Sequence, residues 1–331
     1  MTVKVVIPDD ISGSYASCED IERLRAVAEV EMFPTHPGSE AELTRRIRDA
    51  NVILSFRPAF TKFPASAIAA CPALRMICIS GTGVEDVDVA AATARGIAVA
   101  NVPGPSNRAV AELCFALMLD VARSVALQDR RIRRGEWQAV QGLELGGKTL
   151  GIVGLSGIAR ELAPLAASFG MRVLSWSRNN DPARAAAAGA TAVSLAELFA
   201  QADVLSLHLR LHPQTRGFIG EPEFARLKTG AILINTARGE IVDETALIAA
   251  LESGKLRGAG LDVFAQEPLP RDHRLLTLDN VVMTPVAGWN TIDAARRMLR
   301  QSIDNVACFL AGNPINIVNQ PAKGTQSKES Q

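Results

Sequence analysis

Short, strongly apolar runs recur along this chain, and stretches with helical periodicity separate them. Runs of this length, bounded by turn residues, are typical of strands buried on both faces of a parallel sheet. Strands that alternate with helices predict right-handed β-α-β units and a doubly wound α/β fold. The runs are Val3–Ile7, Val52–Ser55, Leu74–Ser80, Ile97–Asn101, Thr149–Leu155, Arg172–Ser177, Val204–Leu209, Ala231–Asn235, Ala259–Val263 and Val281–Thr284.

The alternation pauses once, after Pro103-Gly104-Pro105, where a long helical stretch covers Arg108–Arg134. A second alternating series follows, and a helix over Ile292–Leu310 returns the chain to the first. We therefore expect two Rossmann-like domains with an interdomain cleft, one from residues 1–103 plus 291–320 and one from 104–290. The polar segment 321–331 is predicted to be a disordered tail.

Charge and composition restrict the partners and the compartment. Lys+Arg and Asp+Glu both total 35, so no basic stripe or acidic tail points to nucleic acid or a membrane surface. The N-terminus carries charges early and resembles a strand, not a signal peptide, and no apolar stretch reaches the ~18 residues of a membrane span. Five scattered cysteines show neither a CxxC pair nor a metal-ligand cluster. We expect a soluble, cytoplasmic protein with a small-molecule ligand and no metal.

A glycine-bearing turn between a strand and a helix carries the cofactor signal. The turn reads Gly154-Leu155-Ser156-Gly157-Ile158, and the pattern G-x-G-x-x-G/A aligns Gly154, Ser156 and Ala159. Free N–H groups and the dipole at the helix start would hold a pyrophosphate. Ser156 replaces the middle glycine, so it would either crowd the pyrophosphate or donate its hydroxyl to it. A tight structural turn without a ligand is the alternative.

The next strand ends in Ser177-Arg178-Asn179, where a site that prefers NAD usually has an acid for the ribose hydroxyls. An arginine at this place accommodates a 2′-phosphate. The sequence therefore favours NADP over NAD. NAD binding without the carboxylate, beside a solvated Arg178, stays open.

Several later segments together resemble the D-isomer-specific 2-hydroxy acid dehydrogenases over about residues 50 to 318. They are Gly81-Thr82-Gly83, Asn101–Glu112, Leu207-His208-Leu209 with Thr215, Asn235-Thr236-Ala237-Arg238-Gly239, and Gly260–Pro268. The resemblance implies an NAD(P)-dependent oxidoreductase that moves a hydride between nicotinamide and a 2-hydroxy or 2-oxo acid. It also implies a homodimer, paired through the helix 108–134 and the loop to Gly147. The domain 104–290 would bind the dinucleotide, and the other domain would bind the substrate.

The same resemblance implies roles for individual residues. Arg238 would clamp the oxo acid and polarise its carbonyl, and Glu267 would pair with a catalytic histidine. The backbone of Gly81, Thr82 and Gly83 would hold the substrate carboxylate. Residues expected to line the cofactor site are His208, Thr215, Thr236, Ala237 and Asp262. Arg238, Glu267 and Asp262, each taken alone, are equally compatible with a structural role.

One position departs from the family pattern T-P-H-x-G, because Val286 follows Thr284-Pro285 where the catalytic histidine should stand. A positioned acid–base group typically contributes about 10²–10⁴-fold to the rate, and valine cannot move a proton. Of the four histidines, His208 is assigned to the cofactor site, and His273 in its polar loop is expected to be solvated.

Five explanations of Val286 stay open. Glu267, desolvated by an apolar neighbour, would handle the proton, or the substrate, for example an iminium, would need no proton relay. An apolar or bulkier group would occupy the space of the imidazole, or the protein would be a redox-linked switch with weak or no turnover. The last explanation is that the histidine was removed by engineering. The substrate pocket is not identified by any motif, although Phe56, Arg57 and Trp289 are candidates for its lining.

Overall fold

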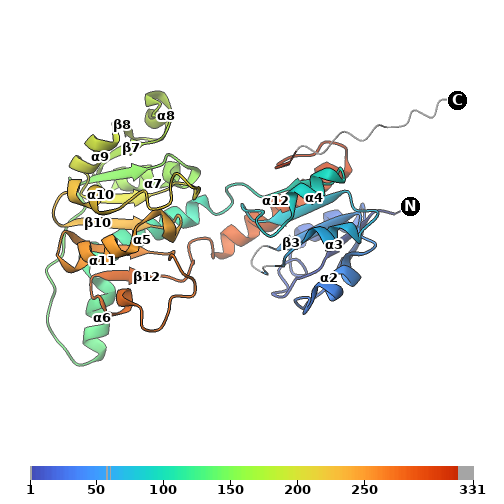
Figure 1. The fold of residues 1–331 in the computed structure, drawn as a ribbon, viewed down its shortest axis with the longest axis horizontal. Coiled ribbons are helices and arrows are strands. Elements are labelled where there is room, and N and C mark those ends of the chain that lie inside the picture. Colours follow the sequence, from blue (N-terminus) through green and yellow to red (C-terminus); the bar gives the residue numbers. More distant parts are fainter. Residues whose placement is uncertain (1, 57–58, 60, 320–331) are drawn as a thin grey trace. The chain divides into compact units, whose positions relative to one another are not determined.

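The computed structural model describes residues 2–56, 59 and 61–319 (Figure 1). The chain divides into two compact units, unit 1 from Met1–Pro105 and Ile292–Gln331 and unit 2 from Ser106–Thr291. The chain passes from unit 1 to unit 2 after residue 105, two residues later than the sequence suggested. It returns to unit 1 after residue 291, one residue later than suggested. We expected Arg57 to line the substrate pocket and the segment 321–331 to be disordered. Both lie outside the described residues.

Unit 1 is built on a five-stranded parallel sheet with the strand order β2-β1-β3-β4-β5. The strands β3, β4 and β5 are buried along their whole length, as their unbroken apolar sequences predict. The elements of unit 1 are β1 (Lys4–Ile7), a 3-10 helix (Glu19–Ile21), α1 (Glu22–Arg25), β2 (Glu29–Met32), α2 (Glu40–Ile47), β3 (Val52–Phe56), α3 (Ala65–Ala69), β4 (Met76–Ser80), α4 (Val89–Ala94), β5 (Ala98–Ala100) and α12 (Ile292–Leu310).

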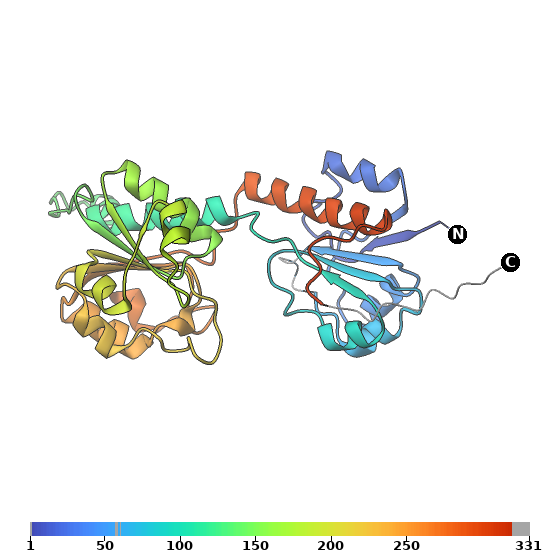
Figure 2. The ribbon, with the colours of Figure 1, turned by 90° about the horizontal axis from the view of Figure 1, so that it is seen from above.

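The returning helix α12 completes the core of unit 1. The hydroxyl groups of Tyr15 and Ser302 lie 3.0 Å apart, and the amide Nδ2 of Asn305 donates to the carbonyl of Asn101 at 2.8 Å. Figure 2 shows α12 lying along the strands of this unit. Unit 1 is therefore made from two chain segments that the whole of unit 2 separates.

Unit 2 is built on a seven-stranded parallel sheet with the order β12-β11-β10-β9-β6-β7-β8. Both sheets confirm the doubly wound α/β prediction. The elements of unit 2 are α5 (Asn107–Arg123), α6 (Val125–Arg133), β6 (Thr149–Val153), α7 (Gly157–Ser168), β7 (Arg172–Trp176), α8 (Pro182–Ala187), β8 (Thr191–Ala192), α9 (Leu195–Gln201), β9 (Val204–Leu207), α10 (Glu221–Arg226), β10 (Ala231–Asn235), a 3-10 helix (Gly239–Ile241), α11 (Glu244–Glu252), β11 (Leu256–Leu261), a 3-10 helix (Arg274–Thr277) and β12 (Val281–Met283).

The order of strands in unit 2 reverses at β6. The chain proceeds from β6 to β7 and β8 on one side and then continues with β9 on the other side of β6. Ligands of such sheets bind outside the carboxyl ends of the strands at this reversal. The turn that follows β6 is the one at Gly154, so the topology places the cofactor signal at the expected position.

The long helix expected over 108–134 is broken in two. Ser124 takes a left-handed backbone conformation (φ 53°) between α5 and α6. The Asp120 carboxylate accepts the N–H of Ala126 at 2.8 Å, and the main-chain carbonyl of Asp120 accepts the N–H of Ser124. A local side-chain acceptor therefore competes with helix continuation, a competition that apolar periodicity does not reveal.

Two further sequence expectations need correction. The apolar spacing of Ile21–Val27 predicts a helix there, but the structure has a single short turn, α1, after a 3-10 helix, and the strand β2 was not predicted. The strand β2 reads Glu-Val-Glu-Met and lies at the edge of its sheet. One side of an edge strand is not covered by a neighbouring strand, so charged side chains are tolerated there. No helix within the described residues is long and apolar enough to cross a membrane.

Candidate active site

The turn after β6 has the geometry of a phosphate cradle. Gly154 has φ 97°, and a Cβ atom there would lie 2.9 Å from the carbonyl carbon and oxygen of His208. The positive φ and the close approach of the His208 carbonyl group each exclude a side chain at position 154. The Ser156 hydroxyl accepts the N–H of Ala159 at 3.3 Å and so caps α7, which leaves the N–H groups of Gly157 and Ile158 at the first turn for an anion.

The strand β7 places Ser177 and Arg178 beside this turn. The N–H of Gly154 donates to the carbonyl of Trp176 at 2.8 Å, so the two strand ends lie at the same level. Arg178 and Asn179 are exposed, and among the described residues Arg178 has no ion-pair partner. A second cation, which the sequence analysis missed, is Arg184 of α8, whose guanidinium donates to the carbonyl of Leu155 at 3.1 Å. This edge of the turn is therefore electropositive and suits a phosphate group.

His208 lies behind the turn and is buried. Its Nε2 atom is 2.9 Å from the Ser206 hydroxyl, whereas Nδ1 is buried without a hydrogen-bond partner. Burial lowers the pKa of the imidazole to about 4, so the ring is neutral near pH 7. A neutral ring lacks the imidazolium proton that a general acid would donate at that pH.

Two of the threonines assigned to the cofactor site already have hydrogen-bond partners. The Thr215 hydroxyl accepts the N–H of His212 at 2.9 Å and donates to the carbonyl of Arg210 at 2.7 Å. The Thr236 hydroxyl lies 3.0 Å from the Cys114 sulfur. Both side chains are buried, and both shape the loops that follow β9 and β10.

These features fit a dinucleotide. The turn at Gly154 admits only hydrogen, the start of α7 presents free N–H groups, and the buried Nδ1 atom of His208 lacks a partner. No group of three or more metal-ligating side chains lies within the part of the chain that the structure describes.

The loop after β10 is held by its own asparagine. The Asn235 Oδ1 atom accepts the N–H of Ala237, and its Nδ2 atom donates to the carbonyl of Arg238, both at 3.0 Å. The Arg238 side chain is exposed, and its Nη1 atom donates to the Ala237 carbonyl at 2.6 Å. Among the described residues no carboxylate pairs with this guanidinium, so it is available to an anionic ligand.

The loop after β11 lies directly against the Arg238 loop. A Cβ atom on Gly239 would lie 2.0 Å from the carbonyl carbon of Phe264, so only glycine permits this contact. Glu267 belongs to the same loop, and its Oε1 atom accepts the N–H of Phe264 at 3.0 Å. The structure therefore brings the backbones carrying Arg238 and Glu267 together.

Glu267 is exposed, which corrects one sequence expectation. We expected an apolar Val286 to desolvate this carboxyl group and to favour its protonated form. The side chain is instead exposed, and its Oε1 atom accepts the backbone N–H of Phe264. The desolvation that we expected is therefore absent.

The segment after β12, which contains Val286, is fixed by Asp262. The buried carboxylate accepts hydrogen bonds from the Thr284 hydroxyl (2.5 Å) and from the N–H groups of Ala287 (2.7 Å) and Gly288 (3.0 Å). Its main-chain carbonyl accepts the N–H of Val286 at 3.0 Å. The resemblance places Asp262 in the lining of the cofactor site, and the hydrogen bonds that its carboxylate accepts hold the 284–288 segment.

Val286 itself takes a left-handed conformation, with φ 54°, and is 38% exposed. This conformation is rare for β-branched residues and marks backbone strain. The structure thus presents an apolar side chain at the position where the family pattern has an imidazole.

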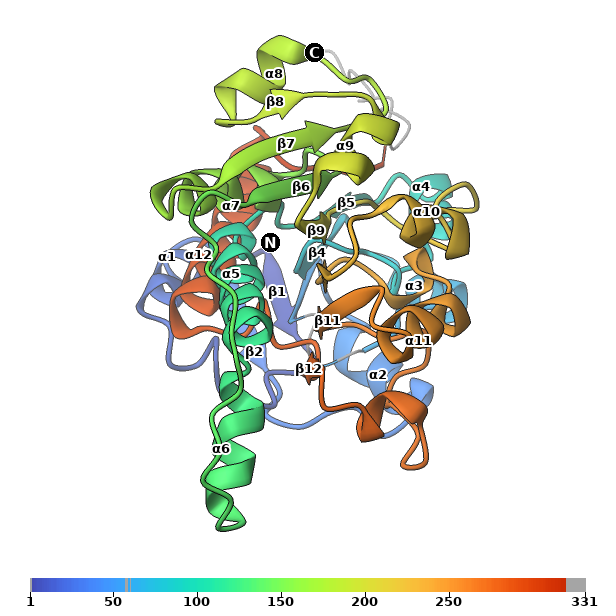
Figure 3. The ribbon, with the colours of Figure 1, turned by 90° about the vertical axis from the view of Figure 1, so that its left-hand side faces the viewer.

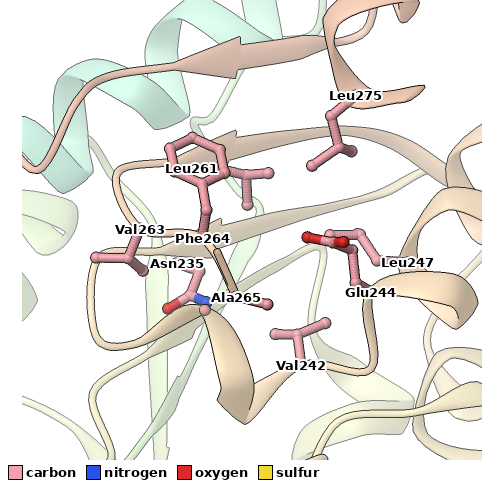
Figure 4. Close-up of a pocket in the computed structure, with 10 residues that line it drawn as sticks. Asn235, Val242, Glu244, Leu247, Leu261, Val263, Phe264, Ala265 and Leu275 are labelled. Atoms are coloured by element: carbon pink, nitrogen blue, oxygen red, sulfur yellow. The ribbon is translucent and has the colours of Figure 1, made fainter. Parts of the chain in front are cut away.

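His273 is not solvated, contrary to expectation. Its Nε2 atom lies 2.9 Å from Oε1 of Glu244, and its Nδ1 atom accepts the N–H of Leu275. Figure 4 shows the Glu244 carboxylate directed into a small pocket whose other walls include Asn235, Phe264 and Leu275. No sequence motif connects residues 29 positions apart, so this pair could not be found from the sequence.

The predicted substrate residues of unit 1 are placed as follows. Gly81 donates its N–H to the Ile79 carbonyl at 2.9 Å, so the free backbone amides expected for a carboxylate are those of Thr82 and Gly83. The Asn101 side chain donates to the Thr82 carbonyl at 2.6 Å and orders this loop. Phe56, a pocket candidate, is buried, with its ring edge against Tyr15.

Comparison with known proteins gives consistent matches. The family model of the D-isomer specific 2-hydroxyacid dehydrogenase, NAD binding domain, matches residues 115–288. The D-3-phosphoglycerate dehydrogenase of Methanocaldococcus jannaschii is 38% identical over 323 residues, covering 96% of this chain and 60% of that protein. The glyoxylate reductase of Korarchaeum cryptofilum is 38% identical over 291 residues, covering 86% of this chain and 87% of that protein. The chain thus spans 60% of the length of the first relative and most of the second.

A solved structure gives a third comparison. The acyclic imino acid reductase Bsp5, in complex with NADPH and D-Arg, has a TM-score of 0.82 and 28% identity, with 96% of this chain and 100% of that chain covered. The matched segment 115–288 includes the turn at Gly154, Arg238, Glu267 and Val286. The site residues of unit 2 described above therefore lie within the matched domain, whereas Gly81, Thr82 and Gly83 of unit 1 lie outside it.

Relief of the strain at Val286 should stabilise unit 2. We expect Val286→Asn to raise its free energy of unfolding by about 1 kcal/mol, because asparagine accepts the left-handed conformation more readily than valine. Urea unfolding followed by tryptophan fluorescence measures this, since all three tryptophans lie in unit 2. The control Val125→Asn changes an exposed valine without positive φ and should give no gain. A V286N protein no more stable than wild type would contradict the assigned strain.

The buried His208 should make unit 2 sensitive to acid. Its pKa in the folded state is about 4, below its ordinary value of 6.5, so the unfolded state binds the extra proton between these values. This contribution to stability is complete above about pH 6.5 and falls by up to about 1.4 kcal/mol per pH unit toward pH 4. Unfolding free energies of wild type and His208→Asn over pH 4 to 7.5 test this. Parallel curves for the two proteins would show that the histidine is not buried in its neutral form.

Proposed function

This chain belongs to the D-isomer specific 2-hydroxyacid dehydrogenase family, and from that premise we propose that it transfers a hydride between a nicotinamide dinucleotide and a small 2-oxo or 2-hydroxy acid or a related substrate. One observation carries the proposal. The exposed guanidinium of Arg238, which has no ion-pair partner among the described residues, stands at the carboxyl edge of the sheet whose strand order reverses at the Gly154 turn. An anion site and a dinucleotide turn then share one edge of one sheet.

The proposed cofactor is NADP(H). When bound, the nicotinamide supplies or accepts the hydride. The N–H groups at the start of α7 would hold the pyrophosphate. The exposed Arg178 would meet the 2′-phosphate, since no acid occurs among the four residues 177–180 directly after β7. The similar structure named with NADPH supports this preference.

Arg238 would bind the substrate carboxylate. A guanidinium fork matches the two oxygens of a carboxylate or of an oxo acid, and its charge polarises a neighbouring carbonyl group. The fixed Asn235 turn holds the backbone from which this side chain extends, so little ordering is needed when the acid binds. The role of the Thr82 and Gly83 amides in carboxylate binding stays a prediction, whereas the N–H of Gly81 already donates to the Ile79 carbonyl.

Val286 widens the proposed substrate range. Without an acid–base side chain at this position, a ketone loses a contribution of about 10²–10⁴-fold to its reduction rate. The similar structure that is named as an imino acid reductase supports the inclusion of C=N substrates beside C=O substrates.

A redox-linked switch is the second candidate function, and Val286 is the observation that favours it. A protein that binds NADPH and consumes none of it needs no proton relay. The exposed side chains of Arg238 and Glu267 argue against this candidate, because pure cofactor binding requires neither charge.

Nucleotide binding and turnover together test the function. We expect calorimetry to find NADPH bound more tightly than NADH, and Arg178→Ser to weaken NADPH about tenfold while NADH changes little, because only NADPH carries the 2′-phosphate. The absorbance of NADPH in the presence of each member of a panel of 2-oxo acids and imines then reports consumption of the cofactor. Arg238→Ala should reduce this consumption. Absence of binding by either nucleotide would refute the enzyme and the switch alike, and binding without consumption across the panel would favour the switch.

We also propose that the protein is a homodimer. No residue of α6 is buried, and Figure 3 shows this helix extending beyond α5, away from the strands of unit 2. Trp137 in the following loop is 89% exposed, and Val125 and Ile132 are exposed as well. A second copy would cover these apolar groups. Sedimentation velocity should find a dimer at micromolar concentration that Trp137→Ser weakens, and a monomeric wild-type protein would contradict the proposal.

A further inference from the structure

We propose that the substrate of this site is a protonated C=N compound, a 2-iminium acid that is reduced to a 2-amino acid. This inference rests on the proposed function and narrows it to one substrate class. It is carried by two side-chain charges at the site, those of Arg238 and Glu267, that have no ion-pair partner in the described part of the chain, and by the apolar side chain at position 286.

The site lacks a proton donor near the loops that carry Arg238 and Glu267. Val286 cannot carry a proton, and the Asp262 carboxylate beside it already accepts three hydrogen bonds and is buried. His208 is neutral and buried, and the imidazole of His273 is paired with Glu244. Among the described residues of unit 2, no side chain at these loops is arranged to protonate an alkoxide.

The two substrate classes differ in their need for that proton. Reduction of a 2-oxo acid forms a C–H bond at C2 with the hydride pair and moves the C=O π electrons to oxygen, which must receive a proton. In a 2-iminium acid the nitrogen already carries its proton. The hydride pair forms the C–H bond, the C=N π electrons become the nitrogen lone pair, and the neutral amine later takes a proton from water. Only the first reaction depends on an acid at the position of Val286.

The charges of the site point the same way. Arg238 presents a cation and Glu267 an anion, and neither has an ion-pair partner among the described residues. Their loops touch at Gly239 and Phe264, so the two charges belong to one small region of unit 2. A carboxylate there attracts an iminium cation and repels an alkoxide that is gaining negative charge.

A 2-iminium acid matches this pair of charges. Its carboxylate suits the Arg238 guanidinium, and its cationic nitrogen suits Glu267, so the substrate supplies the positive charge that no side chain of the site offers to Glu267. A 2-oxo acid satisfies only Arg238 and leaves the Glu267 carboxylate facing a carbonyl oxygen. Glu267 is thereby assigned to recognition of the substrate cation.

Two probes with five carbons separate the classes: 1-pyrroline-2-carboxylate, a cyclic imine, and 2-oxopentanoate. With NADPH, we expect kcat/KM for the imine to exceed that for the oxo acid by about 100-fold. Glu267→Gln should lower the imine value about tenfold and leave the oxo acid value within about twofold. Val286→His, which places an imidazole at a backbone conformation that histidine tolerates better than valine, should raise oxo acid reduction about tenfold.

A binding measurement gives a readout that does not depend on turnover. Calorimetry of the protein loaded with NADP⁺ should show proline binding more tightly than 2-hydroxypentanoate, and Glu267→Gln should weaken proline about tenfold but not the hydroxy acid. Circular dichroism of each variant checks that it is folded.

The outcomes separate this inference from the function on which it rests. Equal or faster reduction of 2-oxopentanoate by wild type, or proline binding that Glu267→Gln leaves unchanged, would overturn the iminium substrate and leave the dehydrogenase function standing. NADPH binding with no reduction of either probe would overturn the iminium substrate and favour the switch. No NADPH binding at all would remove the proposed function itself.

Discussion

The carboxylate of Asp262 is the constraint on which the chemistry of this site depends. Three hydrogen bonds from the 284–288 segment converge on it, and a fourth joins its main chain to Val286. A buried carboxylate needs such donors, because unpaired charge inside a protein is costly. The same bonds fix the backbone of Val286 at positive φ, so the requirement of one buried anion determines how position 286 is presented.

The parallel sheet explains why the candidate residues gather. Strands β10, β11 and β12 are neighbours with one direction, so the loops after them emerge at the same edge. Arg238, Glu267 and Val286 come from these three loops, although they span 49 residues of sequence. Close backbone contact at Gly239 then removes the space between the first two loops. The fold thus supplies the proximity, and the side chains supply the selectivity.

Much of this arrangement could be predicted from the sequence, for definite physical reasons. Unbroken apolar runs identify buried parallel strands, and a glycine between strand and helix identifies the cradle at Gly154, because both patterns are local. The break at Ser124, the pairing of His273 with Glu244 and the exposure of Glu267 could not be predicted in this way. The break at Ser124 depends on a local bond from a backbone N–H to the Asp120 side chain, which apolar periodicity does not reveal. The other two depend on how segments distant in the sequence pack after folding. The substitution of valine at position 286 was visible in the sequence, but its left-handed backbone was not.

Unit 1 has a consequence for the order in which the molecule is made. Its sheet is complete by residue 100, yet α12 and the strand-like contact of Val318 with Val99 come from the far end of the chain. A ribosome therefore releases all of unit 2 before unit 1 can receive its last helix. Until then, the apolar face around Tyr15 that Ser302 later covers is open to water. The nascent chain thus exposes an apolar surface for the time needed to synthesise an entire domain. Chaperones have that interval in which to bind it.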